Sequence, residues 1–181
     1  MKNEVRLIGG SFRRSKLPVA DRPGLRPTPD RVRETLFNWL GQDLHGWRVL
    51  DAFAGSGALG FEAASRGAAE VLLLEQDAVL VASLRQSQQR LGAAALRVER
   101  TDALNWLARA APARFELVML DPPFDSGWAA DAAQAAAPLV VPGGFLYVES
   151  PAPLPSPPGA LQVWRNLRAG AVHAQLFLQP A

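Results

Sequence analysis

Cysteine is absent from the 181-residue sequence, and histidine occurs only at His45 and His173. Disulfide bonds and thiolate metal sites are therefore excluded, and two histidines alone do not complete a zinc site. No apolar run approaches the roughly 20 residues that span a bilayer, and the first residues lack the apolar core of a signal peptide. We expect a cytoplasmic protein, with no metal and no membrane contact, that acts as a monomer. The length predicts one domain with a small extension.

Lysine is also scarce, since seventeen of the nineteen basic residues are arginine. Residues 1–33 carry a net charge of +6, whereas the remaining chain carries −4. A bias toward arginine codons explains the choice of arginine over lysine but not this clustering. A basic arm favours contact with a polyanion, and arginine suits bidentate contact with phosphate. The alternative is that Arg26, Arg31 and Arg33 pair with Asp30 and Glu34 on a solvated helix face. The candidate nucleic-acid-binding residues are Arg13, Arg14, Lys16, Arg26, Arg31 and Arg33.

Residues 1–45 form the predicted extension. Val5–Ile8 and Lys16–Val19 have the pattern of two short strands joined by a turn. The proline-rich stretch Asp21–Pro29 is typical of an extended linker. A helix is then predicted to begin with Thr28 as its N-cap and to end at Gly41.

Residues 46–181 form the predicted main domain, in which strand and helix patterns alternate. The predicted strands are Val49–Phe53, Val71–Leu74, Leu96–Glu99, Leu117–Leu120, Phe145–Val148, Leu161–Trp164 and Val172–Leu178. The predicted helices are Ala58–Arg66, Ala78–Leu91, Ala103–Ala110 and Ala129–Ala137. This alternation predicts an α/β fold with a doubly wound, mostly parallel, Rossmann-like sheet of seven strands, the last two forming an antiparallel pair.

A glycine-rich turn follows the first strand of this domain. The run from Gly55 to Gly60 fits G-x-G-x-x-G, and Glu75 stands twenty residues after Gly55 at the end of the next strand. Glycines let the backbone approach a ligand, and a carboxylate at this spacing accepts both hydroxyls of a ribose. Taken alone, the pattern fits NAD as well as another nucleoside cofactor.

Three acidic positions move the interpretation toward S-adenosylmethionine. Asp51 precedes the glycines, where it can meet the cationic amino group of a methionine moiety. Asp102 can accept from an adenine amine beside the Ala103 N–H, although an N-cap role for Asp102 fits equally well. Asp121 ends the fourth strand, next to the expected position of the sulfonium methyl. The candidate cofactor-binding residues are Asp51, Phe53, Gly55, Gly57, Glu75, Asp102 and Ala103.

The tetrapeptide Asp-Pro-Pro-Phe after the fourth strand suits a planar exocyclic amine. Such an amine is a poor nucleophile because its lone pair is delocalised into the base. Acceptance of its two hydrogens, by the Asp121 carboxylate and the Pro122 carbonyl, favours a pyramidal nitrogen, and the aromatic ring stacks on an unstacked base. The alternative is a proline-rich structural turn. The candidate catalytic residues are Asp121, Pro122, Pro123 and Phe124.

Trp128, Glu149 and the other tryptophans give weaker signals. Trp128 either lines the base pocket or packs against a helix, and Glu149 is expected to be structural. The other tryptophans are predicted to be packing residues: Trp39, Trp47, Trp106 and Trp164.

The whole chain resembles the bacterial 16S ribosomal RNA guanine-N2 methyltransferases, the RsmD-like family. The matching segments are Val5–Gly10, Arg14–Val19, Gly24–Leu40, Phe53–Gly60, Asp121–Phe124 and Tyr147–Ser150. The first-helix segment is more diagnostic than the glycine turn, which many methyltransferases share. The resemblance implies methylation of one guanine N2 in 16S ribosomal RNA, from S-adenosylmethionine, on the small ribosomal subunit.

Three other functions are left open by the residues. Asp-Pro-Pro-Phe also serves an adenine-N6 methyltransferase of RNA or DNA, although no segment resembles a separate DNA-recognition domain. The second alternative is a ribosome-assembly factor that binds RNA and keeps the fold without catalysis. The intact Asp51, Glu75 and Asp121 argue against it, because such a factor does not need them. A nicotinamide oxidoreductase is disfavoured, because no second catalytic domain and no proton-relay histidine are apparent in the sequence.

Overall fold

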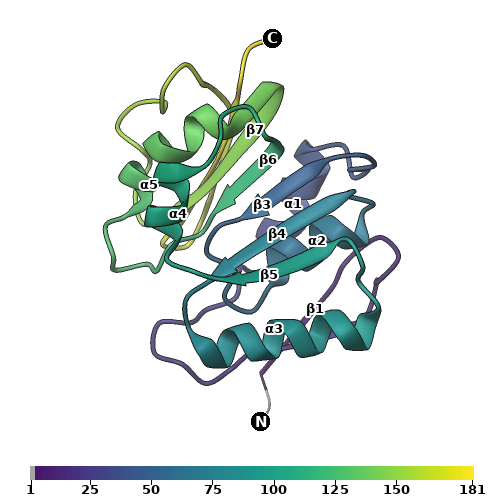
Figure 1. The fold of residues 1–181 in the computed structure, drawn as a ribbon. Helices are drawn as coiled ribbons and strands as arrows, with labels where there is room; N and C mark the ends of the chain where they lie inside the picture. The colour runs from purple at the N-terminus through teal and green to yellow at the C-terminus, as the bar shows by residue number, and fades with distance from the viewer. Residues whose placement is uncertain (1–2) are drawn as a thin grey trace.

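Strands and helices alternate along the chain in the computed structural model, which describes residues 3–181 (Figure 1). The strands of the central sheet are β3 (Arg48–Asp51), β4 (Glu70–Glu75), β5 (Leu96–Arg100), β6 (Phe115–Leu120), β7 (Val140–Ser150), β8 (Gln162–Ala169) and β9 (Val172–Leu178). Their order is β5-β4-β3-β6-β7-β9-β8, with β3 to β7 parallel and β9 antiparallel to both neighbours. The predicted seven-stranded, doubly wound sheet is therefore confirmed.

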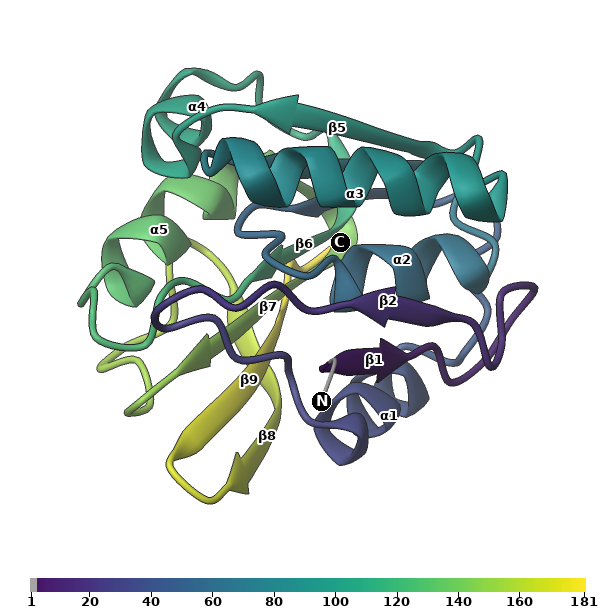
Figure 2. The same cartoon turned by 90° about the horizontal axis from the view of Figure 1, so that it is seen from below.

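Helices cover both faces of the sheet. Within residues 3–181 the α-helices are α1 (Asp30–Trp39), α2 (Ala58–Ser65), α3 (Ala78–Leu91), α4 (Ala103–Arg109) and α5 (Ala129–Ala136), and a 3-10 helix η1 follows at Ala137–Leu139. One buried cluster joins the sheet to α1, α2 and α3, and a second joins it to α4 and α5. Figure 2 shows the first three helices together, beside the N-terminal strands. None of these helices is long and apolar enough to cross a membrane.

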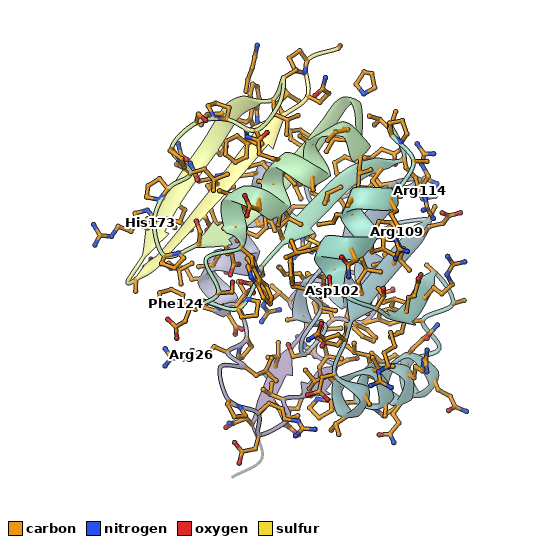
Figure 3. The ribbon with its side chains drawn as sticks, turned by 60° about the vertical axis from the view of Figure 1, so that its left-hand side comes forward. Arg26, Asp102, Arg109, Arg114, Phe124 and His173 are labelled. Carbon is orange, nitrogen blue, oxygen red and sulfur yellow. The ribbon has the colours of Figure 1, made fainter. Side chains whose placement is uncertain are left out.

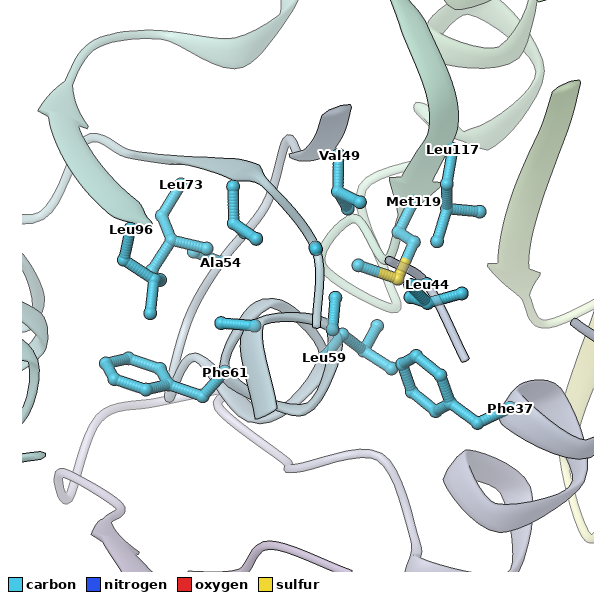
Figure 4. Close-up of a cluster of buried hydrophobic side chains, with 14 of the residues drawn as sticks. Phe37, Leu44, Val49, Ala54, Leu59, Phe61, Leu73, Leu96, Leu117 and Met119 are labelled. Carbon is cyan, nitrogen blue, oxygen red and sulfur yellow. The ribbon is translucent and has the colours of Figure 1, made fainter. Parts of the chain in front are cut away.

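The strands supply both clusters because adjacent residues point to opposite faces of a sheet. Val49 of β3 packs in the cluster of Phe37 and Leu59 (Figure 4), whereas its neighbour Leu50 packs in the other cluster. With helices on both faces, a parallel strand is apolar almost throughout. This is why β4 and β6 are nearly continuous apolar runs in the sequence.

The N-terminal extension shares the core of the main domain. Strands β1 (Glu4–Arg6) and β2 (Lys16–Pro18) form an antiparallel pair, and Leu7 and Leu17 are fully buried in the same cluster as α2. The buried carboxylate of Glu62 on α2 accepts the Ile8 N–H at 2.9 Å. The division into residues 1–45 and 46–181 remains a prediction, but the two parts are packed as one body.

The start of α1 differs from the prediction. The helix begins at Asp30 with Pro29 in the N-cap position and no side-chain cap, so the N-cap role predicted for Thr28 is wrong. The Thr28 hydroxyl instead lies 3.3 Å from Asp121 Oδ2 and 3.2 Å from Glu149 Oε2. Two carboxylates from distant strands are stronger acceptors than any group the first turn offers, and local sequence does not reveal them.

The tryptophan predictions hold except at one position. Trp39 and Trp47 pack against one core cluster and Trp106 against the other. Trp164 is 43% exposed, so the packing role predicted for it is wrong. Its strand, β8, is the edge strand of the sheet, and most of its residues are exposed.

Candidate active site

Four carboxyl groups meet at one edge of the sheet. Asp51 ends β3, Glu75 ends β4, Asp121 follows β6, and Glu149 is the next-to-last residue of β7. Parallel strands end at the same edge, which is where open α/β sheets bind ligands. Burial raises the pKa values of Asp51 and Asp121, and the nearby charge of Glu149 raises both further. The cluster is therefore suited to a ligand with positive charge or several hydrogen-bond donors.

The turn between β3 and α2 depends on its glycines. Gly57 is the N-cap of α2 with a left-handed φ of 86°, and the N–H of Gly55 donates to Glu75 Oε1 at 3.1 Å. A Cβ at Gly60 would lie 2.1 Å from the Leu73 side chain. The glycines thus hold the turn close to the end of β4, beside the Glu75 carboxylate.

Asp51 carries an unsatisfied buried oxygen. Its Oδ2 accepts the Gly60 N–H at 3.0 Å, whereas its Oδ1 is buried without a hydrogen-bond partner among the described residues. Burial raises its pKa to about 7, against the lowering effect of the Gly60 bond. An unpartnered buried carboxylate oxygen is costly, and a cationic amino group supplies both the missing donor and the opposite charge. Asp51 therefore fits the methionine end of an S-adenosylmethionine-type donor.

We expect Asp51→Asn to stabilise the ligand-free protein. The folded-state pKa of about 7 lies above the ordinary 3.8, so the destabilising effect of the charge is absent below about pH 4, grows with pH and is complete above about pH 7. Asparagine keeps an oxygen for Gly60 without the charge. Urea denaturation should show about 1–3 kcal/mol more unfolding free energy at about pH 8 and little change at about pH 4. The exposed Asp125→Asn is the control, and equal stability of Asp51→Asn and wild type at both pH values would contradict the interpretation.

The linker between β2 and α1 lies over the glycine turn. The Leu25 Cδ1 atom is 3.0 Å from the position that a Cβ on Gly55 would take. Arg22 pairs with Asp77 at 3.3 Å, and the Asp77 N–H donates to Glu75 Oε2 at 2.9 Å. A hollow of about 340 Å³ beside these contacts is lined largely by linker residues. The linker therefore closes one side of the candidate cofactor site.

The other side of this site is aromatic. Phe53, two residues after the end of β3, stacks on Trp128 with ring centroids 6.4 Å apart. Trp128 therefore packs on a candidate cofactor residue and stays 38% exposed. Asp102 caps α4 by accepting the Asn105 N–H at 2.9 Å, and Ala103 is buried behind it. The N-cap alternative for Asp102 is therefore confirmed, and its contact with adenine remains a prediction.

Asp121 and Glu149 form a coupled acidic pair. The Thr28 hydroxyl lies within hydrogen-bond distance of both, and Tyr147 donates to Glu149 Oε1 at 2.7 Å. Burial raises the pKa of Asp121 well above its ordinary value, and the charge of Glu149 adds to this. Burial also raises the pKa of Glu149, although the hydroxyls of Tyr147 and Thr28 oppose the shift. Because the Tyr147 hydroxyl donates to Glu149 and not to Asp121, the ionised form is better stabilised at Glu149 than at Asp121.

The second half of the tetrapeptide, Pro123 and Phe124, is exposed, whereas Pro122 is buried. The N–H and the hydroxyl of Ser126 both donate to the Pro123 carbonyl. By contrast, no described residue donates to the Pro122 carbonyl. Phe124 is 46% exposed, and Figure 3 shows it at the margin of the molecule between Arg26 and His173. The geometry leaves a free acceptor and a free aromatic face beside the Asp121 carboxyl group.

The candidate RNA-binding residues are not gathered at this edge. The loop with Arg13 and Arg14 contacts Ser65 at the end of α2, because the N–H groups of Ser11 and Phe12 donate there. Helix α2 starts at the glycine turn and has eight residues. The loop at its far end therefore lies roughly 12 Å, the length of this helix, from the candidate cofactor site. Lys16 follows this loop on β2 and pairs with Glu4 at 3.5 Å. Arg26 and Arg31 are exposed and lie within three residues of Thr28, whose hydroxyl contacts Asp121.

The prediction that Arg33 contacts RNA is wrong. Its side chain is fully buried, pairs with Asp30 and lies 4.0 Å from the buried carboxylate of Glu62. It also donates to the carbonyl oxygens of Arg6 and Thr28, at 3.1 and 3.2 Å. Arg33 therefore joins α1, β1, the linker and α2, and no phosphate can reach it.

Sequence reasoning missed Thr28 and Tyr147 as parts of the acidic pair. The local sequence predicts a cap role for Thr28 and includes Tyr147 only in the matching segment Tyr147–Ser150. Two signals were available in the sequence. Tyr147 stands two residues before Glu149, so both side chains lie on the same face of β7, and Thr28 lies next to the first helix. Within residues 3–181 no group of three or more His, Asp or Glu side chains is placed to hold a metal ion.

Comparison with known proteins agrees with this geometry. The family model described as "Conserved hypothetical protein 95" matches residues 5–178. "Ribosomal RNA small subunit methyltransferase D" of Escherichia coli (strain K12) is 40% identical, over 98% of this chain and 91% of that protein. The protein of the same name from Haemophilus influenzae is 42% identical, over 82% and 80%. The solved structure of a putative methyltransferase from Escherichia coli covers 99% of both chains with a TM-score of 0.89 and 39% identity. The chain therefore belongs to the family of the ribosomal RNA small subunit methyltransferase D proteins.

Proposed function

We propose that this protein transfers a methyl group from S-adenosylmethionine to the exocyclic N2 amine of a guanine in 16S ribosomal RNA of the small subunit. The observation that carries the proposal is the sheet edge itself. It brings the Asp121 carboxyl group, the free Pro122 carbonyl and exposed Phe124 together with the glycine turn and the unpartnered Asp51 oxygen. The names of the relatives support ribosomal RNA of the small subunit as the substrate class.

The cofactor is held by residues from three strand ends. Asp51 Oδ1 accepts a hydrogen bond from the amino group of the methionine moiety, and the turn from Gly55 to Gly57 supplies backbone contacts. The Glu75 carboxylate accepts hydrogen bonds from the ribose hydroxyls. Glu75 Oε1 and Oε2 already accept the N–H groups of Gly55 and Asp77, which fix the carboxylate in place. Asp102 and the Ala103 N–H bind the adenine ring. When bound, S-adenosylmethionine supplies an electrophilic methyl group on a sulfonium, which is a good leaving group.

The protein activates the amine by positioning it. The Asp121 carboxylate and the Pro122 carbonyl each accept a hydrogen bond from one N–H, so the lone pair leaves the plane of the base. The proton that the methylated amine loses passes to the Asp121 carboxylate. Phe124 stacks on the unstacked base and fixes its plane. These groups lie at the end of one rigid strand, so little reorganisation is needed on reaction. Arg26 and Arg31 contact the flanking phosphates.

Cofactor binding is tested at Glu75. We expect Glu75→Ala to weaken S-adenosylmethionine binding by about 1.5–3 kcal/mol, which is the range for a hydrogen bond to a charged group. Isothermal titration calorimetry measures the change, and exposed Glu34→Ala on α1 is the matched control. An unchanged affinity would remove Glu75 from the cofactor site.

The function is tested by transfer of a tritiated methyl group to small ribosomal subunits from cells that lack the modification, followed by nucleoside identification. N2-methylguanosine is the expected product. N6-methyladenosine would change the substrate base, because the tetrapeptide serves either amine. Tight S-adenosylmethionine binding without transfer would indicate an assembly factor, and binding of NAD in its place would indicate an oxidoreductase. The predicted monomeric state and cytoplasmic location remain predictions.

A further inference from the structure

The β8–β9 hairpin has an exposed basic surface that the site above does not use. Residues 150–181 contain Arg165, Arg168 and His173 but no aspartate or glutamate. Both arginines are exposed on β8, which is the edge strand of the sheet and pairs only with β9. The structure gives Arg165 and Arg168 hydrogen bonds only to main-chain oxygens of the hairpin, and no ion pair within residues 3–181. Their charges are therefore available to a partner.

The tip of this hairpin stands at the edge that holds the candidate active site. His173 pairs with Ser150, the last residue of β7, and on its other side with Arg168. The end of β7 lies beside the end of β6, where Asp121 follows. Figure 3 shows His173 and Arg26 on either side of Phe124 along one margin. The hairpin and the linker thus flank the exposed aromatic ring.

An aromatic side chain lies on the same strand. Trp164 sits at the irregularity between Val163 and Arg165, is 43% exposed, and has the Arg165 guanidinium 4.7 Å from its ring centroid. Unpaired bases stack on aromatic rings and on guanidinium planes, while arginines hold the phosphates. A protein partner would need acidic groups to satisfy the arginines, whereas RNA offers phosphate and bases together.

We propose that the outer edge of the β8–β9 hairpin is a second RNA-binding surface, which holds the strand on the side of the target base opposite Arg26. This proposal rests on the proposed function. A base that leaves its stack to reach Phe124 keeps nucleotides on both sides, and the linker contacts only one side. Arg165 and Arg168 are three residues apart in the regular register of β8, so they leave the strand on opposite faces and bind phosphates across its outer edge. Trp164 with Arg165 offers a stacking face.

The test compares the double variant Arg165→Ala/Arg168→Ala with Arg97→Ala, an exposed arginine on β5 at the opposite edge of the same sheet. With unmodified small subunits as substrate, we expect the KM of the double variant to rise about 5- to 20-fold. The affinity for protein-free 16S ribosomal RNA should also depend less on salt. The magnitude of the slope of log affinity against log salt concentration should decrease by roughly 1–2, as for two lost phosphate contacts. Affinity for S-adenosylmethionine, thermal unfolding and the single-turnover rate at saturating subunits should stay unchanged, and Arg97→Ala should behave as wild type.

Two results would overturn the hairpin proposal while leaving the proposed function intact. One is an unchanged KM and salt slope in the double variant alongside an active wild-type protein. The other is a defect on assembled subunits with unchanged affinity for protein-free RNA, which would assign this edge to a ribosomal protein. A wild-type protein that binds S-adenosylmethionine but methylates no subunit would instead overturn the proposed function, and the hairpin proposal with it.

Discussion

Asp121→Ala should lower the single-turnover rate of methyl transfer by about two to four decades, comparable to loss of a positioned base or of one transition-state hydrogen bond. The carboxyl group of Asp121 lies beside the free Pro122 carbonyl, and its removal leaves one hydrogen of the target amine without an acceptor. Binding of S-adenosylmethionine and of RNA should be retained, because the proposed cofactor contacts lie elsewhere and the RNA keeps its proposed contacts with Phe124, Arg26 and Arg31. Single-turnover measurement isolates the chemical step from product release.

The amide variant separates charge from geometry. Asp121→Asn keeps an acceptor oxygen without the negative charge, and we expect trace activity. Burial and the Glu149 charge raise the pKa of Asp121, and the acceptor must be deprotonated. The wild-type rate should therefore rise with pH as the Asp121–Glu149 pair ionises, and Asp121→Asn should lose this rise. Near-normal single-turnover rates in Asp121→Ala would show that the tetrapeptide is a structural turn.

Arg33→Ala should cost about 3–5 kcal/mol of unfolding free energy, the range for removing one partner of a buried ion pair. The Arg33 guanidinium is fully buried near the Glu62 carboxylate, which is also buried. Among residues 3–181, its loss leaves Arg66 at 3.5 Å as the one remaining ionic partner of that charge. The loss also leaves the Arg6 and Thr28 carbonyls without the donor that Arg33 supplies. Urea denaturation monitored by circular dichroism measures the difference.

The matched control lies on the same helix. Arg31 is exposed, so Arg31→Ala should change stability by no more than about 0.5 kcal/mol while weakening RNA binding. The two arginines thus have opposite expected phenotypes. A stable Arg33→Ala protein whose only defect is weaker, less salt-dependent RNA binding would restore the original prediction for this residue.

Most of the sheet and the order of its ligand-facing turns follow from local sequence. Strands such as β4 and β6 are short apolar runs bounded by turn residues, and the helices between them have capping residues such as Asp77 and Gly92. The positions of Asp51, Glu75 and Asp121 directly after such runs place them at one edge in any parallel sheet. Local sequence alone therefore determined the position of the glycine turn and of the tetrapeptide.

The roles of individual charges and hydroxyls were decided only by tertiary packing. Arg33 and Arg31 are two residues apart in one basic arm, yet one faces the core against Glu62 and the other faces solvent. Thr28 finds its acceptors on β7 and beyond β6, about a hundred residues away in sequence, and Trp164 is exposed because its strand lies at the edge of the sheet. Local sequence specifies the backbone through propensity and periodicity, but whether a charge is buried and which group it meets depends on contacts between distant segments.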